Sequence, residues 1–332
     1  MEMGILGLPQ SGKSTLFEIM TGVKVSPSHT ETVVRGQASV PDARFDRLVE
    51  IYKPAKVSPA RVPFIDVHAV GEHPWEAIRQ NLSGADGILH VVDGFSLPDI
   101  SIALDAYRKL EDELVLSDLI IIEKKLERLA KMSKKAISPQ ETAQNDLLPR
   151  LKDCLEAGKP LRGAGLTAQD VFTLRSFSFW TIKPEMVVVN VAEDNPAFAD
   201  EFAKAARLAE PVMGICCKIE AELAGLDAAD QKEFLSSMGI AEPAFGRIIR
   251  AAFSLLGRMS CFTKVPRVVG KGKTTGPRLD DAVWPGANTM AFFVLPAGRA
   301  KVVMQAFAHL RATIGKKAGL KAFLLGVEAQ TD

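Results

Sequence analysis

The residues with the clearest chemical meaning form the segment GLPQSGKS, residues 7–14. It matches the pattern GxxxxGK[ST], in which glycines let backbone amides point inward around phosphates. Lys13 would reach the β- and γ-phosphates of a nucleotide, and the Ser14 hydroxyl would coordinate Mg²⁺. The pattern therefore predicts a phosphate-binding loop. The residues expected to surround the phosphates are Pro9, Gln10, Ser11, Gly12, Lys13, Ser14 and Thr15.

Such a loop needs a strand before it, a helix after it and an acid nearby. An apolar run at 3–6 precedes it, and a helical pattern at 14–22 follows it. The amino end of that helix would add favourable partial charge for an anion. A second apolar run ends with Asp66, which is the candidate acid associated with Mg²⁺.

Short apolar runs recur along the chain between polar, glycine or proline residues. Strands covered by helices on both faces read as continuous apolar runs, and alternating strands and helices are typical of an α/β fold. We therefore predict an α/β fold with a doubly wound, mostly parallel sheet. The expected strands are 3–6, 62–67, 87–93, 186–191 and 211–217.

A stretch without strand-like runs interrupts this alternation from about residue 107 to residue 176. Its first part, LEDELVLSDLIIIEKKLERLAKMSKK, spaces apolar residues as a long amphipathic helix does. The following SPQETAQNDLLPRLKDCLEAGKP reads as a capped second helix that ends near Gly158. We expect an antiparallel helical insert at 107–180, within a nucleotide-binding domain at 1–106 and 181–257. An ordinary pair of surface helices is the alternative.

Composition excludes several classes of protein. Hydrophobic residues make up 47% of the 332 residues and charged residues 24%, which is ordinary globular usage. The formal net charge of +1 gives no general electrostatic case for nucleic-acid binding. No apolar run approaches the ~20 residues that span a bilayer, and no signal peptide begins the chain. Four cysteines without a CxxC pair make a disulfide framework or a zinc site improbable, so the cytoplasm is the expected location.

Five segments together resemble the YchF/Obg-like ATPases, a family in the translation-factor class of P-loop GTPases. They are GLPQSGKSTLF, VPDARFDRLVEIYKPAKVSPARVPFIDV, ELVLSDLIIIEKKLERL, KPEMVVVNVAED and CCKIEAELAGLDAADQKEFLSSMGIAEPAFGRIIRAAFSLLG. The resemblance covers about residues 3–257. It implies a P-loop G domain with an inserted α-helical coiled-coil hairpin, and a ribosomal or translation-linked partner.

The resemblance also implies further site residues. Thr30 aligns with the family's second Mg²⁺ ligand, with Thr32 as a close alternative. Asn190, Val191, Ala192 and Glu193 occupy the base-reading position, where ordinary GTPases carry NKxD and a carboxylate that reads guanine. The family's NVxE version implies relaxed specificity or a preference for ATP. The segment Cys217, Lys218, Ile219 matches the loop that packs on the base.

Three departures from the family bear on catalysis. The family reads DIAGL where this chain reads DVHAV at 66–70, so Ala69 replaces the glycine that senses the γ-phosphate. The glycine- and lysine-rich stretch that should follow is missing. The loop at 95–98 lacks the family's histidine, which leaves His68, His73 and His90 as the available candidates for proton or water chemistry. His68 is favoured because it follows Asp66, and contact with a phosphate or a merely exposed position is the alternative role. His90 lies within a strand pattern and is expected to be structural.

The C-terminal residues 258–332 resemble part of a PII-like signalling protein, a small α+β unit with a ferredoxin-like fold, in the place of the family's TGS domain. The strand MAFFVLP, a helix at 299–314 and the strand LKAFLLGVEA are expected there, and the helix at 244–256 could serve as the unit's first helix. The resemblance implies trimer formation or sensing of a small ligand. The basic segment GKGKTT reads either as a solvated loop or as a contact for an anion, a nucleotide or RNA.

The function predicted from the sequence is Mg²⁺-dependent binding of ATP or GTP with slow hydrolysis, in a nucleotide switch. The alternative is a nucleotide-bound sensor or scaffold that does not hydrolyse and forms homo-oligomers through its C-terminal unit. The departures at 66–70 motivate this alternative.

Overall fold

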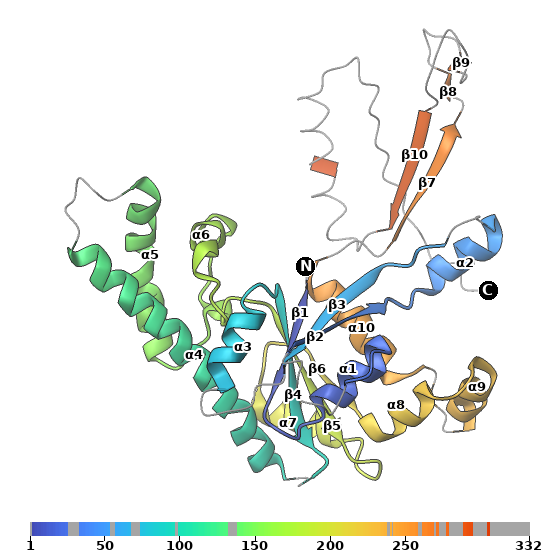
Figure 1. Cartoon of the computed structure of the whole chain (residues 1–332), viewed down its shortest axis with the longest axis horizontal. Helices are drawn as coiled ribbons and strands as arrows, with labels where there is room; N and C mark the ends of the chain where they lie inside the picture. Colours follow the sequence, from blue (N-terminus) through green and yellow to red (C-terminus); the bar gives the residue numbers. More distant parts are fainter. Residues whose placement is uncertain are drawn as a thin grey trace. The chain divides into compact units, whose positions relative to one another are not determined.

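The computed structural model describes residues 2–25, 33–53, 57–67, 74–96, 99–131, 138–237, 240, 242–257, 261–268, 270–271, 277–278, 288–294 and 304–305. The chain divides into two compact units (Figure 1). The first unit comprises Met1–Pro41 and Arg61–Gly257, and the second comprises Asp42–Ala60 and Arg258–Asp332.

A six-stranded sheet in the order β2-β3-β1-β4-β5-β6 forms the centre of the first unit. Strand β1 is parallel to β3 and β4, β4 is parallel to β5, and β5 is parallel to β6, whereas β2 pairs antiparallel with β3. This confirms the predicted α/β fold with a mostly parallel sheet. The strands are β1 Met3–Gly7, β2 Val33–Ser39, β3 Arg61–Val67, β4 Gly87–Gly94, β5 Glu185–Val191 and β6 Val212–Ile215.

Two strands differ from the prediction. Strand β2 was not predicted, because it lies at the edge of the sheet and its exposed Arg35 and Gln37 interrupt the apolar run. The last strand was expected to continue to residue 217, but β6 ends at Ile215 because Cys217 already begins a helix.

Helices cover both faces of the sheet. Helices α1 and α10 pack against one face, and α3, α4 and α7 pack against the other. The helices of the first unit are α1 Lys13–Thr21, α3 Pro74–Leu82, α4 Ile100–Lys131, α5 Pro139–Glu156, α6 Ala168–Leu174, α7 Phe198–Ala206, α8 Cys217–Ala224, α9 Ala228–Ser237 and α10 Ala244–Leu255, with short 3₁₀ turns at Leu161–Gly163 and Arg175–Phe177.

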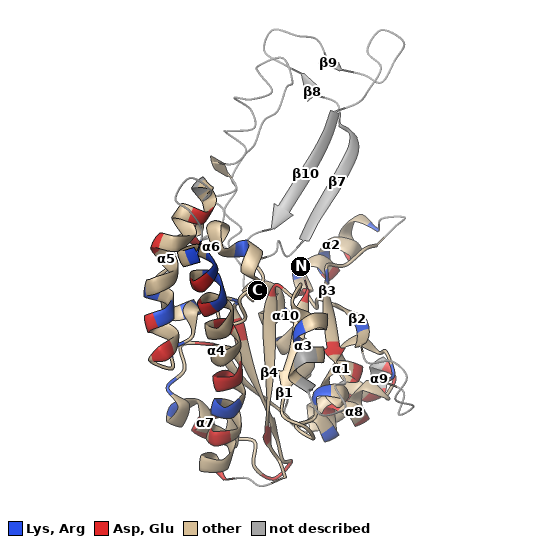
Figure 2. Cartoon of the chain, turned by 60° about the vertical axis from the view of Figure 1, so that its left-hand side comes forward, with Lys and Arg blue, Asp and Glu red and all other residues tan. Residues whose placement is uncertain are grey.

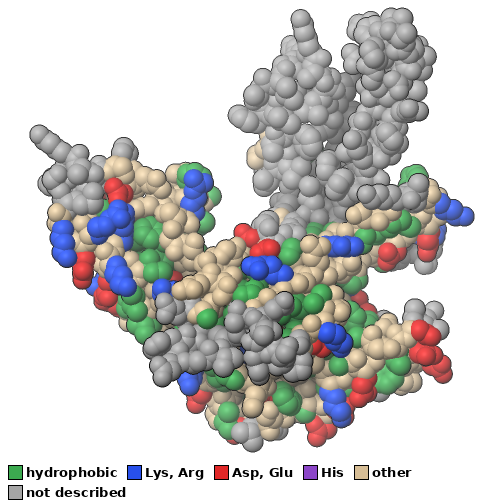
Figure 3. All heavy atoms as spheres, viewed as in Figure 1, with side chains coloured by type: hydrophobic (Ala, Val, Ile, Leu, Met, Phe, Trp, Pro, Cys, Tyr) green, Lys and Arg blue, Asp and Glu red, His purple; other side chains and the backbone are tan. Residues whose placement is uncertain are grey.

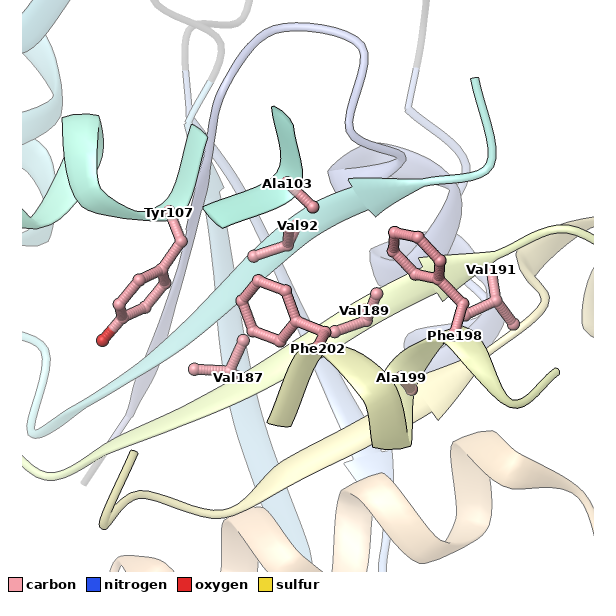
Figure 4. Close-up of a cluster of buried hydrophobic side chains, with 9 residues drawn as sticks. All are labelled: Val92, Ala103, Tyr107, Val187, Val189, Val191, Phe198, Ala199 and Phe202. Atoms are coloured by element: carbon pink, nitrogen blue, oxygen red, sulfur yellow. The ribbon is translucent and has the colours of Figure 1, made fainter. Parts of the chain in front are cut away.

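Buried aromatic side chains fix helices α4 and α7 on the sheet. Figure 4 shows Phe198 and Phe202 of α7 lying over the valines of β4 and β5, with Tyr107 of α4 beside them. Phe202 is fully buried, and burying a side chain of this size contributes about 1.5–3 kcal/mol. This cluster holds rigid the strands whose carboxyl ends carry the candidate site.

The predicted pair of helices is present as α4 and α5, and both cations and anions lie along them (Figure 2). Lys125 and Arg128 of α4 both pair with Glu141 near the start of α5, while Glu123 pairs with Lys152. Residues later in α4 thus pair with residues earlier in α5, so the two helices run antiparallel.

Local hydrogen bonds determine where helices α4 and α5 begin. Ser138 and Glu141 form a capping box at the start of α5, as the sequence indicated. Helix α4 begins at Ile100 rather than near residue 107, since the Asp99 carboxylate accepts from the backbone N–H of Ser101 at 2.8 Å. The expected start of the insert at residue 107 therefore lies inside a continuous helix.

The second unit contains helix α2, Ala43–Tyr52, and two strand pairs. Strand β7, Cys261–Val268, pairs antiparallel with β10, Asn288–Val294, and β8, Gly270–Lys271, pairs with β9, Pro277–Arg278. The strand expected at MAFFVLP is thus present as β10. The predicted last strand and most of the helix predicted at 299–314 lie outside the described residues, and the PII-like resemblance stays a prediction.

Helix α10 does not belong to the C-terminal unit. It packs against α1, β3, β5 and β6, with Ile248 and Ile249 buried. Its apolar face completes the core of the first unit, so the suggestion that this helix serves as the first helix of the C-terminal unit was wrong.

On the face seen in Figure 3, hydrophobic, basic and acidic side chains are interspersed over the described residues, in keeping with the net charge of +1. None of the described helices is both long and apolar enough to cross a membrane.

Candidate functional site

The predicted phosphate loop joins the carboxyl end of β1 to the amino end of α1. Gln10 and Gly12 adopt left-handed backbone conformations, with φ angles of 66° and 94°. Gly12 also sits so close to the Asn190 amide that a Cβ at this position would collide with it. Glycine is therefore required at position 12 for both its conformation and its size.

Lys13 is the cation of this loop. Its Nζ donates to the backbone carbonyl of Leu8 at 2.7 Å, which folds the side chain back over the loop. Burial lowers the pKa of Lys13, and attraction to the carboxylate of Asp66 opposes that shift. A lysine held in this way is poised to exchange a carbonyl oxygen for a phosphate oxygen.

Asn190 connects the phosphate loop to the start of α8. Its Nδ2 donates to the Ser11 carbonyl at 3.3 Å, and its Oδ1 accepts from the Cys217 backbone N–H at 3.1 Å. The side chain is only 5% exposed. The amide nitrogen and the amide oxygen of Asn190 thus link three segments: the phosphate loop, the end of β5 and the start of α8.

A cavity of about 800 Å³ opens over these loops. It extends from the end of β1 past the end of β5 to the loop before α8, and it is within the range typical of small-molecule sites. Its walls are Gln10, Gly12, Lys13, Ser14, Thr15, Phe95, Asn190, Val191, Ala192, Glu193, Asp194, Cys216, Cys217 and Lys218.

Most of the predicted phosphate and base residues line this cavity. The exceptions are Pro9, which is exposed, Ser11, which is buried beneath the loop, and Ile219, which is half-buried. The structure thus brings together residues from the start and the end of the first unit, as the predicted parallel sheet requires.

Sequence reasoning missed Phe95, Asp194 and Cys216. Phe95 is the most informative of them, because this large aromatic residue is 42% exposed while lining the cavity. The Asp93 carboxylate accepts from the backbone N–H groups of Phe95 and Ser96, each at 3.0 Å, and so shapes this loop. A large aromatic residue directly after a predicted strand was the available signal.

Two opposite charges line the cavity where the base-reading residues were predicted. Lys218 Nζ lies 3.1 Å from Glu193 Oε1. The hydrogen bond and the charge of Glu193 raise the pKa of Lys218, so the lysine stays protonated at neutral pH.

Only some of the residues predicted to hold Mg²⁺ lie in the part of the chain that the structure describes. Ser14 is half-buried and lines the cavity, and Asp66 is fully buried near the carboxyl end of β3, next to β1. A hydroxyl and a buried carboxylate are oxygen ligands of the kind that Mg²⁺ prefers, so these two residues fit the ion. Thr30, Thr32 and His68 lie outside the described residues.

His90 has a structural role. Its Nδ1 lies 2.9 Å from Glu185 Oε1, and its ring stacks on Tyr107 with the centroids 4.7 Å apart. Its side chain is buried between the sheet and α4, as the strand pattern predicted.

Similarity to known proteins agrees with this site. The chain is 33% identical over 280 residues to the ribosome-binding ATPase YchF of Haemophilus influenzae, and the match covers 78% of this chain and 77% of that protein. The chain belongs to the YchF family. A Bacillus subtilis YchF is 30% identical over 283 residues, covering 78% of this chain and 77% of the relative. The rice Obg-like ATPase 1 is 28% identical over 289 residues, covering 80% and 73%.

The fold is similar to that of the Schizosaccharomyces pombe YchF GTPase, with a TM-score of 0.65 and 19% identity. That match covers 93% of this chain and 85% of the solved chain. No protein-family model matches the chain. Membership of the YchF family confirms the resemblance predicted from the sequence, and with it a P-loop protein that binds nucleotide.

Proposed function

We propose that this protein binds ATP or GTP together with Mg²⁺ in the cavity and hydrolyses it slowly to the diphosphate and phosphate. The observation that carries the proposal is the single cavity that runs from Lys13 and Ser14 to Glu193 and Lys218. Phosphates placed on the loop would leave the base at the far end, between residues that follow β4, β5 and β6.

Each part of the loop has a role in this proposal. The backbone amides at the start of α1 hold the phosphates, with the helix terminus adding partial positive charge. Lys13 exchanges the Leu8 carbonyl for phosphate oxygens. Ser14, Asp66 and Thr30 hold the cation, which when bound neutralises charge on the phosphates.

We infer slow hydrolysis from the sequence at 66–70. Val70 stands where other GTPases place a glutamine that orients water, and Ala69 stands where the family has glycine. His68 is our candidate for handling the proton of the attacking water. A sensor that binds nucleotide without hydrolysing it is the second candidate, and the same replacements favour it.

Relatives of this chain are named ribosome-binding ATPases. We propose that the partner is likewise a ribosome or a translation-linked complex in the cytoplasm, and that the insert at 107–180 responds to the bound nucleotide. Formation of homo-oligomers through residues 258–332 stays a prediction.

Single-turnover release of phosphate from excess protein tests the proposal. We expect release from Mg²⁺–ATP, and an Asp66→Asn substitution should weaken the effect of Mg²⁺ on nucleotide affinity about 10- to 100-fold. Asp153→Asn on the exposed face of α5 is the matched control. Binding without any phosphate release would favour the sensor over the hydrolase, and an unchanged Mg²⁺ effect in Asp66→Asn would contradict the assigned cation site.

The Phe95 ring should stack on the base. We expect Phe95→Ala to weaken ATP and GTP binding alike by about tenfold, because stacking depends on the π-face that every base shares. Equilibrium binding of a fluorescent ATP analogue, with Phe95→Trp as the control that keeps an aromatic ring, measures this. Equal affinities of the alanine variant and the unaltered chain would show that the ring does not contact the base.

A further inference from the structure

Glu193 and Lys218 come from different loops but meet in the cavity. Glu193 follows β5, and Lys218 is the second residue of α8 after β6. Both strands are separated from β1 by β4 in the sheet, so the pair lies on the side of the cavity remote from the phosphate loop. It therefore stands where the base of a bound nucleotide would lie.

The position of the pair is fixed by a buried contact. Asn190 precedes Glu193 by three residues, and its Oδ1 accepts from the N–H of Cys217, directly before Lys218. This hydrogen bond is buried, whereas the Lys218 and Glu193 side chains are 70% and 46% exposed. The backbone that carries the pair is thus rigid while the two charged groups remain available to a ligand.

The pair offers one hydrogen-bond acceptor beside one donor. Adenine presents a donor at N6 next to an acceptor at N1, and guanine presents an acceptor at O6 next to donors at N1 and N2. A carboxylate alone complements guanine, but a carboxylate beside an ammonium group complements either base. The ion pair thus supplies a physical cause for relaxed selection between the two purines.

We propose that Lys218 sets the ratio of ATP affinity to GTP affinity, by donating to adenine N1 or guanine O6 while Glu193 accepts from the neighbouring N–H groups. This inference rests on the proposed function, since it requires that the cavity hold a purine nucleotide. It gives Lys218 a role in base selection that its exposed position would not otherwise suggest.

Replacing Lys218 by methionine keeps the length of the side chain but removes the donor. Adenine N1 would then face an apolar side chain and lose its donor, which leaves adenine one hydrogen bond from N6 to Glu193, whereas guanine could still donate to Glu193 from both N1 and N2. We expect the ratio of ATP to GTP affinity to fall about tenfold in Lys218→Met, which is within the range measured for a lost base contact.

Isothermal titration of the full chain with ATP and with GTP measures this ratio. The double variant Lys218→Met, Glu193→Gln should recover relative ATP affinity, because an amide donates and accepts and so matches the adenine edge. Lys152→Met is the matched control, since Lys152 pairs with Glu123 at 3.0 Å on the helical insert. Equal melting temperatures of the variants and the unaltered chain would exclude misfolding as the cause.

An unchanged ratio in Lys218→Met would overturn the inference while leaving the proposed function intact, provided that both nucleotides bind. A fall in the ratio that persists undiminished in the double variant would also overturn it, since the effect would not pass through Glu193. Failure of the unaltered chain to bind either nucleotide would contradict the proposed function itself, and the inference with it.

Discussion

Replacing Lys13 by alanine should weaken ATP binding about 100-fold, since hydrogen bonds to charged groups contribute about 1.5–3 kcal/mol each. The lysine is the cation of the phosphate loop, and the phosphates would lose its ammonium group altogether. In the absence of nucleotide the variant should be no less stable than the unaltered chain. Burial already disfavours the charged form of Lys13, so removal of the side chain relieves that cost.

Thermal unfolding with and without ATP separates these two effects. Saturating nucleotide should raise the melting temperature of the unaltered chain, because a ligand that binds only the folded state stabilises it. The alanine variant should show a much smaller rise at the same concentration. Lys24→Ala, which removes an exposed lysine paired with Glu18 just beyond the same helix, is the control. Equal shifts in the Lys13 variant and the control would contradict the assigned phosphate site.

Replacing Arg162 by methionine should lower the free energy of unfolding by about 3–5 kcal/mol, because it leaves buried carboxylates without their cation. The guanidinium lies between the insert and the sheet. Its Nη1 is 2.8 Å from Glu111 Oε2 of α4 and 2.6 Å from Glu185 Oε2 of β5, and Glu210 lies 3.8 Å away. The buried His90 approaches the second oxygen of Glu185, and Tyr107 donates to Glu111 at 2.9 Å.

The loss of unfolding free energy in Arg162→Met should depend on pH. Burial and the charge of Glu185 already raise the pKa of Glu111. A carboxyl group whose folded-state pKa is raised loses its contribution to stability as the pH rises through that value. Without Arg162 the pKa of Glu111 should rise further, so the variant should be destabilised more at pH 8 than at pH 5. Urea unfolding at the two pH values measures this.

Arg175→Met is the control for Arg162→Met, because Arg175 lies over the exposed Phe172 ring on the surface of the insert. Loss of this exposed cation–π contact should lower the free energy of unfolding by no more than about 1 kcal/mol. A similar small cost for Arg162→Met would show that the buried carboxylates are satisfied without the guanidinium.

The central strands could be predicted because each is covered by helices on both faces and is therefore apolar along its length. Val187, Val188 and Val189 of β5 are all fully buried, for example. Strand β2 could not be found in this way, since its burial alternates and its exposed positions carry polar residues such as Arg35. The early start of α4 depends on Asp99, whose capping role needs the geometry of the neighbouring turn.

The phosphate side of the site could be predicted because its residues are consecutive. The base side required the family resemblance, since Asn190 and Cys217 are far from the loop in sequence. The hydrogen bonds by which Asn190 joins Ser11 of the phosphate loop to Cys217 are visible only in the fold. The ion pair between Glu193 and Lys218 could not be predicted at all, because charged residues after a strand or at the start of a helix are ordinarily solvated.

The buried network of charged and polar side chains around Arg162 could not be predicted from the sequence either. Its members come from β4, α4, a 3₁₀ turn and β5, and each by itself reads as a surface charge or a strand residue. Only the packing of the insert against the sheet brings them together.

The central claim is that the cavity is a site for a purine nucleotide with Mg²⁺. Calorimetric titration of nucleotide-free protein with ATP and with GTP, each with and without Mg²⁺, tests it most directly. We predict that both nucleotides bind as one molecule per chain and that Mg²⁺ tightens both. Heat changes no larger than those of dilution for both nucleotides, from protein that unfolds cooperatively, would contradict the claim.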